Sequence, residues 1–239
     1  MKLESVVFLA GFTSRTFIYF QRMAANGVLP ERVVFFGSED SMATGIIPRK
    51  IQRNIGDPRI DFSISQTEAC EQAGCPYTVI RENSVNHPAI YQNLAGIKPE
   101  LIIYSGYGSQ IVGNSLLEIA PFLHIHAGWL PEERGSTTIY YSMLLNRLCS
   151  ASAILLSRDL DQGKIIARKR YPLPEPGIEI DHFYDNYIRA DLLVNVLQKY
   201  SESGRLPEPI IDTEKGRMYY VIHPILKHIA ILSIDTKPQ

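Results

Sequence analysis

The chain has 239 residues, a formal net charge of −1 and 45% hydrophobic residues. This length and apolar content suit one folded domain with a sizeable core, and they exclude an intrinsically disordered chain. The balanced charge, without any block of Lys and Arg residues, argues against a nucleic-acid binder.

The three cysteines cannot all pair with one another, which is typical of a protein from a reducing compartment. The N-terminal residues lack the apolar core and cleavage site of a signal peptide, and no apolar run approaches the ~18 residues that a membrane helix requires. We therefore expect a cytoplasmic protein without a membrane role. Cys70 and Cys75 have no second pair that would complete a zinc site, and no metal is expected.

Short apolar runs alternate with segments of helical spacing through most of the chain. The predicted elements are strand 5–10, helix 16–26, strand 32–36, helix 65–73, strand 76–80, helix 88–95, strand 101–104, helix 114–120, strand 122–126 and helix 136–148. They are followed by strands 151–156 and 164–167, a helix over 180–204, and strands 218–222 and 228–234. Residues 37–61 show no clear period and are expected to form a long loop.

This alternation predicts an α/β fold, a Rossmann-like and largely parallel sheet with helices on both faces. An antiparallel end is expected after the last helix of the alternating series. We expect a catalytic core over residues 1–175 and an extension over 176–239 within the same compact unit. The extension would hold one helix and a β-hairpin-like pair of strands, which is a candidate contact for a homodimer.

His124 and His126 stand two residues apart in the strand predicted at 122–126, so their side chains are expected on the same face. Ligands of open α/β sheets bind at the carboxyl ends of the strands, where this strand ends. Asp161, further along the chain, is an acid that can orient an imidazole. Two adjacent imidazoles disfavour double protonation, and we expect one ring to be neutral at pH 7.

Two glycine-containing turns follow other predicted strands. The turn from Gly11 to Arg15 opens a helix, whose free N–H groups and dipole favour a phosphate. The alternative is a plain βα turn in which Thr13 or Ser14 caps the helix. The loop 105–112 holds two glycines, which either admit a flat ligand or form an ordinary turn.

Residues 124–135 read HIHAGWLPEERG, and residues 161–163 read DQG. Together they resemble the folate-dependent formyltransferase family, whose motif is Asn-x-His-Pro-Ser-Leu-Leu-Pro-x-Tyr-Arg-Gly with a later Asp-x-Gly. His124 stands where the family has its asparagine. The stretch GSTTIYY at 135–141 is similar to the branch that N-formylates amino sugars, including enzymes of the pseudaminic or nonulosonate type.

The resemblance implies an enzyme that moves a formyl group from 10-formyltetrahydrofolate, its co-substrate, to the amine of a small nucleotide-linked amino sugar for surface-glycan biosynthesis. It implies catalytic roles for His126, Asp161 and His124. The residues implied in folate binding are Tyr107, Gly108, Gln110, Ile111, Val112, Asp159, Leu160 and Gly163. Those implied in acceptor binding are Gly11, Thr13, Ser14, Arg15, Gly128, Trp129, Pro131, Arg134 and Gly135.

Several alternatives remain beside this hypothesis. A glycinamide-ribonucleotide-type formyltransferase shares the short size and a similar phosphate turn. A catalytically weak relative that binds folate or a sugar nucleotide is suggested by His124 in place of the asparagine. A remote alternative is a metal-dependent hydrolase that uses His124, His126 and Asp161. The tRNA-directed members carry a further C-terminal domain, for which 239 residues leave too little room.

Overall fold

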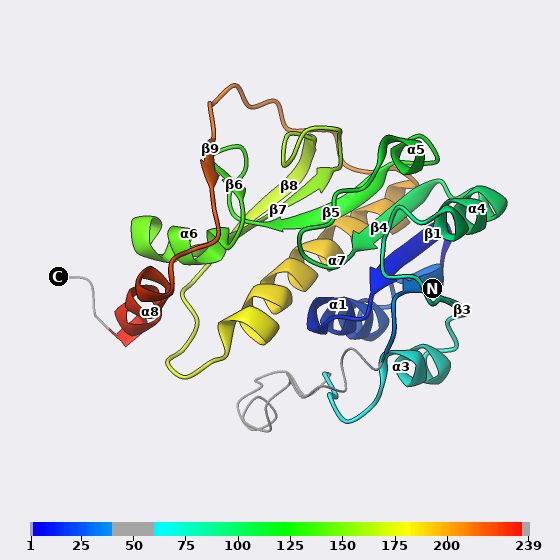
Figure 1. The fold of residues 1–239 in the computed structure, drawn as a ribbon, viewed down its shortest axis with the longest axis horizontal. Coiled ribbons are helices and arrows are strands. Elements are labelled where there is room, and N and C mark those ends of the chain that lie inside the picture. The colour runs from blue at the N-terminus through cyan, green and yellow to red at the C-terminus, as the bar shows by residue number, and fades with distance from the viewer. Residues whose placement is uncertain (1, 40–59, 236–239) are drawn as a thin grey trace.

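The computed structural model describes residues 2–39 and 60–235, and these residues fold around a seven-stranded sheet (Figure 1). The strand order is β3-β2-β1-β4-β5-β7-β8. The strands from β3 to β5 run parallel, and β7 and β8 close the sheet in antiparallel pairing. The predicted Rossmann-like fold with an antiparallel end is confirmed. Most of the long loop predicted at 37–61 lies outside the described residues.

The strands and helices largely follow the predicted order. The strands of the main sheet are β1 (Lys2–Gly11), β2 (Leu29–Phe36), β3 (Tyr77–Ile80), β4 (Leu101–Ser105), β5 (Phe122–Ala127), β7 (Cys149–Leu155) and β8 (Lys164–Tyr171). The helices are α1 (Ser14–Ala25), α3 (Gln66–Gln72), α4 (Pro88–Ile97), α5 (Asn114–Leu117), α6 (Thr138–Asn146), α7 (Asp185–Ser203) and α8 (Pro224–Leu232). A π-helical turn, η2 (Ile180–Tyr184), leads into α7, and a 3-10 turn, η3 (Ser233–Asp235), follows α8. Two short strands, β6 (Glu133–Gly135) and β9 (Arg217–Tyr219), pair in parallel as a second sheet.

Helices cover both faces of the main sheet. Successive side chains of a strand point to opposite faces, and here both sets are apolar and must be buried. In β1, Phe8 packs into a core with residues of α1 and α7, whereas the next residue, Leu9, packs into a core with residues of α4 and α5. Figure 1 shows α1 and α7 side by side, and these two helices contact each other. Both faces of the central strands are therefore closed, and the ends of the strands remain for a site.

Local signals at the helix ends behave as the sequence predicts. Thr13 caps α1, because its hydroxyl accepts the N–H of Thr16 at 3.1 Å. Ser65 and Glu68 form a capping box at the start of α3, where the spacing Ser-x-x-Glu is typical of a helix N-terminus. Gly204 ends α7 in the left-handed conformation.

The strand predicted over 228–234 is wrong, because these residues belong to α8 and to the start of η3. His223 accepts the N–H of Ile225 and Pro224 occupies the first turn, which repeats the His87-Pro88 start of α4. The β-branched composition of this segment favoured a strand, but Ala230 packs fully buried beside α6. The predicted hairpin-like pair is therefore wrong as well, since β9 pairs with β6.

The division of the chain at residue 175 stays a prediction. None of the helices in residues 2–39 and 60–235 is both long and apolar enough to cross a bilayer.

Candidate active site

A cavity of about 510 Å³ lies at the carboxyl ends of β4 and β5. Its walls come from the loop after β4 (residues 106–112), the loop before β8 (156–161), the segment before α6 (135–138) and the segment that contains β9 (218–221). Arg15 of α1 and Arg189 of α7 also line the cavity, together with His124 and His126 of β5. This is the edge of the sheet at which the sequence places the site.

His126 is buried, with 5% of its surface exposed, and it lies between two hydrogen-bond acceptors. Its Nε2–H donates to the main-chain oxygen of Glu133 at 2.6 Å. Its Nδ1 lies 3.4 Å from Oδ1 of Asp161, whose Oδ2 accepts the N–H of Gly135 at 2.8 Å. The structure therefore joins the two residues that the sequence analysis paired.

Burial lowers the pKa of His126, although Asp161 and the carbonyl of Glu133 act in the opposite direction. Burial also lowers the pKa of His124 well below its ordinary value, and the nearby charges of Arg15 and Arg189 lower it further. Both directions favour neutral rings near pH 7. The prediction that at least one ring is neutral awaits a titration.

His124 has a different partner from His126. Its Nδ1 lies 3.4 Å from the main-chain oxygen of Tyr104. A carbonyl can only accept a hydrogen bond, so this contact places the proton of the neutral ring on Nδ1 and leaves Nε2 as an acceptor. Donation from Nε2 of His124 to an oxyanion requires the charged ring or the other tautomer.

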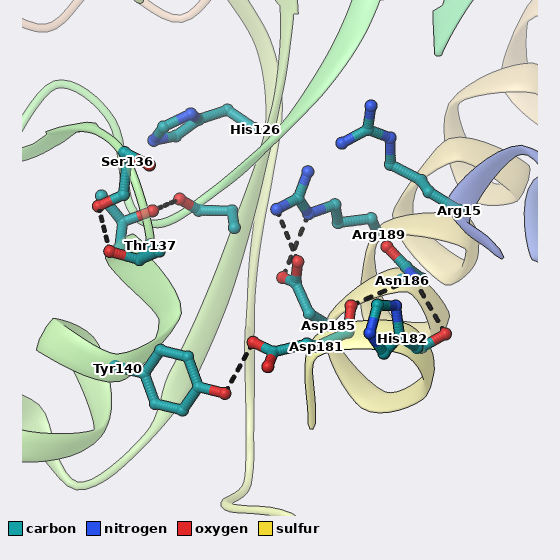
Figure 2. A network of polar contacts seen from close by, with 12 residues as sticks. Arg15, His126, Ser136, Thr137, Tyr140, Asp181, His182, Asp185, Asn186 and Arg189 are labelled. Carbon is teal, nitrogen blue, oxygen red and sulfur yellow. Dashed lines mark hydrogen bonds and ion pairs between the residues drawn. The ribbon is translucent and has the colours of Figure 1, made fainter. Parts of the chain in front are cut away.

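Arg15 and Arg189 bring two guanidinium groups to the same region of the cavity (Figure 2). Arg15 donates from Nε to the hydroxyl of Ser105 at 3.1 Å and from its terminal nitrogen to the carbonyl of Gly106. Arg189 forms a two-bond ion pair with Asp185, at 3.1 and 2.6 Å. Burial lowers the pKa of Arg15, and the nearby charge of Arg189 lowers it further.

With this geometry described, the chain can be compared with known proteins. No family model matches the chain. It is 31% identical over 134 residues to the methionyl-tRNA formyltransferase of Helicobacter pylori strain J99, a match that covers 54% of this chain and 43% of that relative. A sugar N-formyltransferase from a Shewanella species superimposes with a TM-score of 0.57 and 16% identity, covering 96% of this chain and 87% of that structure. The glycinamide ribonucleotide transformylase 1 of Symbiobacterium toebii gives a TM-score of 0.57 and 15% identity, with 88% and 91% covered.

This chain has the formyltransferase fold. It spans less than half the length of the Helicobacter relative. The family named from the His124–Gly135 and Asp161–Gly163 motifs is therefore supported by sequence similarity as well as by fold.

Most residues predicted to bind the folate face the cavity of the formyltransferase fold. The predicted residues that line it are Tyr107, Gly108, Gln110, Ile111, Val112, Asp159 and Leu160. Gly163 does not line it and lies instead on a neighbouring cavity of about 480 Å³, which Asp161 also borders.

Two of these residues also hold the loop after β4 in place. The hydroxyl of Tyr107 accepts the N–H of Phe12 at 3.1 Å and donates to the carbonyl of Phe36 at 3.2 Å. Gln110 accepts the N–H of Val85 at 2.8 Å through its side-chain oxygen. Their binding roles stay predictions, whereas their structural roles are visible.

Only Arg15, of the predicted phosphate turn, lines the cavity. Thr13 is the N-cap of α1, as the alternative predicts, and the phosphate role of the turn stays a prediction. The hydroxyl of Ser14 accepts from Asn186 at 3.2 Å, and Gly11 packs against the ring of Tyr107. An anion held by this region would therefore be expected at the guanidinium of Arg15.

The predicted acceptor residues of the turn after β5 mostly shape the turn. The guanidinium groups of Arg168 and Arg170 both lie over the ring of Trp129, at 4.5 and 4.3 Å from its centre. Arg134 donates to the carbonyl of Gly216 at 3.1 Å. Gly135 lines the main cavity, whereas Pro131 and Arg134 line the neighbouring one. Gly128 has a φ of 125°, a conformation that favours glycine.

The pairing of β6 with β9 has no signal in the sequence, although residues 218–222 were expected to form a strand. Tyr219 accepts the N–H of Ser136 at 2.9 Å, and the hydroxyl of Thr137 accepts the N–H of Ile222 at 2.8 Å. Through these contacts, the chain around and after β9 forms part of the cavity wall. Arg189 and Asp185 were also missed, since their four-residue spacing reveals a helical ion pair but not the cavity it faces.

Within residues 2–39 and 60–235, no group of three or more His, Cys, Asp and Glu side chains is arranged to hold a metal ion.

Proposed function

We propose that the chain is an N-formyltransferase that uses 10-formyltetrahydrofolate as formyl donor. The observation that carries this proposal is the His126–Asp161 pair, 3.4 Å apart in a cavity at the sheet edge of a formyltransferase fold. The activity of relatives such as the Helicobacter enzyme supports it.

The reaction requires a base and a group that stabilises negative charge. The acceptor nitrogen forms a bond to the formyl carbon, the carbonyl oxygen becomes negative, and the bond to the donor nitrogen then breaks while a proton passes from the acceptor to that leaving nitrogen. In its neutral form His126 can take the proton at Nδ1, and Asp161 and the carbonyl of Glu133 then stabilise the charged ring. Such proton transfer contributes about 10²–10⁴-fold to a rate.

Stabilisation of the oxyanion is expected from the cations of the cavity. Arg15 and Arg189 line the cavity and carry fixed positive charge. A preorganised donor at a developing oxyanion is worth about 2.7–4 kcal/mol. We assign this role to the guanidinium groups, because the neutral ring of His124 accepts rather than donates at Nε2 in the tautomer set by Tyr104.

The formyl donor fits between the two loops that hold the predicted folate residues. Ile111 of one loop and Leu160 of the other expose 62% and 51% of their surface and both line the cavity. Exposed apolar side chains on opposing loops suit a flat aromatic ring, and a cavity of about 510 Å³ is the size of a small-ligand pocket. When bound, the donor would supply the activated formyl group for the transfer.

We propose a nucleotide-linked amino sugar as the acceptor and surface-glycan synthesis as the pathway. Arg15 and Arg189 give the cavity a positive region that suits an anionic substrate. Exposed Tyr220 lies on the same cavity and offers an aromatic face for a base. The similarity of fold to a sugar N-formyltransferase supports this acceptor class.

The catalytically weak relative remains the second candidate, and His124 is the observation that favours it. The neutral ring hydrogen-bonded to Tyr104 cannot donate from Nε2 to a developing oxyanion, whereas the side-chain amide of the motif's asparagine can donate. A chain of this kind would bind folate or a sugar nucleotide without rapid turnover.

The experiment is conversion of 10-formyltetrahydrofolate to tetrahydrofolate with a panel of nucleotide-linked amino sugars and glycinamide ribonucleotide. Amine-dependent turnover that His126→Ala abolishes would establish the transferase and identify the acceptor class. Turnover with glycinamide ribonucleotide alone would support that alternative. Folate binding without turnover with any amine would favour the weak relative, and absence of both would contradict the proposal.

We further propose a cytoplasmic homodimer that contacts its partner through α8. Among the apolar residues of α8, Ile225, Leu226, Ile229 and Leu232 are exposed. A second copy would cover this face. Sedimentation showing a monomer at micromolar concentration, or a dimer unchanged by Ile229→Glu, would contradict the interface.

A further inference from the structure

Glu133 is a buried acidic residue, with 3% of its surface exposed, next to the His126–Asp161 pair. Its carboxylate receives hydrogen bonds from four donors. These are the N–H of Trp129 (2.8 Å), the hydroxyls of Ser142 and Ser150 (the latter 3.1 Å) and the side-chain amide of Asn146 (3.0 Å). The donors belong to the turn after β5, to α6 and to β7. One carboxylate thus joins three separate parts of the fold.

The main chain of the same residue holds His126. The carbonyl oxygen of Glu133 accepts the Nε2–H of His126 at 2.6 Å. A carbonyl cannot donate, and its contact at 2.6 Å is shorter than the 3.4 Å contact of Nδ1 with Asp161, so this bond favours the neutral ring with its proton on Nε2 and its lone pair on Nδ1. Nδ1 is the nitrogen that lies near Asp161.

The four hydrogen bonds to the side chain of Glu133 also restrain the position of its main-chain carbonyl. Hydrogen bonds to an ionised acceptor are shorter and stronger than those between neutral groups. A buried carboxylate that lost its donors would carry a large desolvation cost, so the network resists displacement. Movement of the peptide at residue 133 relative to β5 is therefore opposed by contacts to α6 and β7.

We propose that Glu133 is a positioning residue for His126: its buried carboxylate fixes the peptide carbonyl that holds the ring as the Nε2–H tautomer with Nδ1 beside Asp161. The family motif has tyrosine at this position, so the device is a property of this chain. Its significance for catalysis rests on the proposed formyl transfer, but the geometry can be tested without it.

The charged and titratable groups around His126 come from several elements. Asp161 approaches from the loop before β8, Asp185 and Arg189 from α7, and His124 from the same strand. Figure 2 shows Asp185 and Arg189 paired in the neighbourhood of His126. A change at Glu133 keeps all of these groups but removes a buried carboxylate, which can itself shift the titration of His126. The tautomer of the neutral ring is therefore the readout that reports on the peptide carbonyl.

The test is nitrogen-15 NMR of histidine-labelled protein without ligands, with His126 assigned from a His126→Gln variant. In the wild type, the neutral ring is expected to show a protonated Nε2 and an unprotonated Nδ1. Glu133→Gln removes the charge and leaves an amide NH2 facing at least one of the four donors, so the network must rearrange and we expect a mixture of tautomers and a shifted His126 titration. Glu175→Gln, at an exposed position away from the cavity, is the matched control and should leave the signals unchanged.

A milder variant keeps the test decisive if Glu133→Gln does not fold. Asn146 is an exposed residue that gives one hydrogen bond to the carboxylate, so Asn146→Ala should fold and shift the His126 signals in the same direction by less. Unchanged tautomer and titration in the folded variants would overturn the proposal. A wild-type ring protonated on Nδ1 when neutral would overturn it as well.

Kinetics then separate this inference from the proposed function. With an active acceptor, Glu133→Gln should lower kcat by about 10- to 100-fold, as a displaced catalytic group does, and should shift the acid limb of the pH profile. A loss of kcat that follows the loss of folded protein, with an unchanged pH profile, would indicate a merely structural residue. A shifted NMR titration without turnover of any amine would refute the proposed function and leave the positioning role intact.

Discussion

The two histidines of β5 occupy opposite electrostatic regions of one cavity. His126 lies between two acceptors, Asp161 and the carbonyl of Glu133, which favour its charged form. His124 lies near two cations, Arg15 and Arg189, which oppose its charged form. Both rings belong to the same strand and differ by two positions. The comparison teaches that the role of an imidazole depends on residues from distant segments of the chain. The two-residue spacing of the histidines does not reveal these partners.

The largest expected effect is at His126, because its surroundings support the gain and loss of a proton. His126→Gln should reduce kcat for formyl transfer by about 10²–10⁴-fold. Steady-state turnover of 10-formyltetrahydrofolate measures this, with thermal unfolding as the control for folding. A variant with more than a third of wild-type turnover would contradict the role of His126 as base.

Asp161→Asn removes one of the two acceptors and is expected to lower kcat by about 10²-fold, as for a displaced catalytic group. Loss of the carboxylate also removes an influence that raises the pKa of His126, so the acid limb of kcat/KM should move to lower pH. A pH–rate profile from pH 4.5 to 8.5 measures both effects. An unchanged acid limb would show that Asp161 does not act on His126.

Arg15→Gln tests the cationic region without disturbing the ion pair of Arg189 with Asp185. A charge-assisted hydrogen bond contributes about 1.5–3 kcal/mol, so KM for an anionic acceptor should rise by about 10- to 100-fold. Because the same guanidinium is assigned to the oxyanion, kcat should fall as well. Competition by inorganic pyrophosphate should weaken in parallel. Equal kinetics in the variant and the wild type would place the anion elsewhere.

His124→Asn converts the second ring to the residue of the family motif and should change kcat by less than about 10-fold, if the guanidinium groups supply the donors to the oxyanion. Turnover of the variant and the wild type with the same acceptor measures it. A gain of about 100-fold or more would instead support the weak relative and assign the oxyanion role to position 124.

The smallest effect is on stability in acid. The pKa values of His124 and His126 are lowered in the native state, so the unfolded chain binds protons more readily than the native protein. Stability is then fully present above the ordinary histidine pKa of about 6.5 and decreases as the pH falls below it, by about 1.4 kcal/mol per unit of pKa shift for each ring. Urea unfolding at pH 7.5 and 5.5 measures this. A His124→Asn variant with the same pH dependence as the wild type would contradict the contribution of His124.

Much of the sheet was predictable because local patterns and packing agree there. Alternation of apolar runs with helical segments gave the parallel strands, and the Ser65–Glu68 box marked the start of α3. The helix α8 was missed although its His223-Pro224 start repeats that of α4, because its β-branched residues resemble a strand. Capping and the burial of Ala230 outweighed that propensity.

The candidate site was predictable only in part. The sequence by itself singled out His126 and Asp161, whose types and order match a known motif, and His124, which stands where that motif has asparagine; their catalytic roles stay predictions. The tertiary structure decided their partners: Glu133 with His126, Arg15 and Arg189 around His124, and the chain after β9 at the cavity wall. The physical reason is that burial and charge act through space, whereas a sequence pattern records only what is near along the chain.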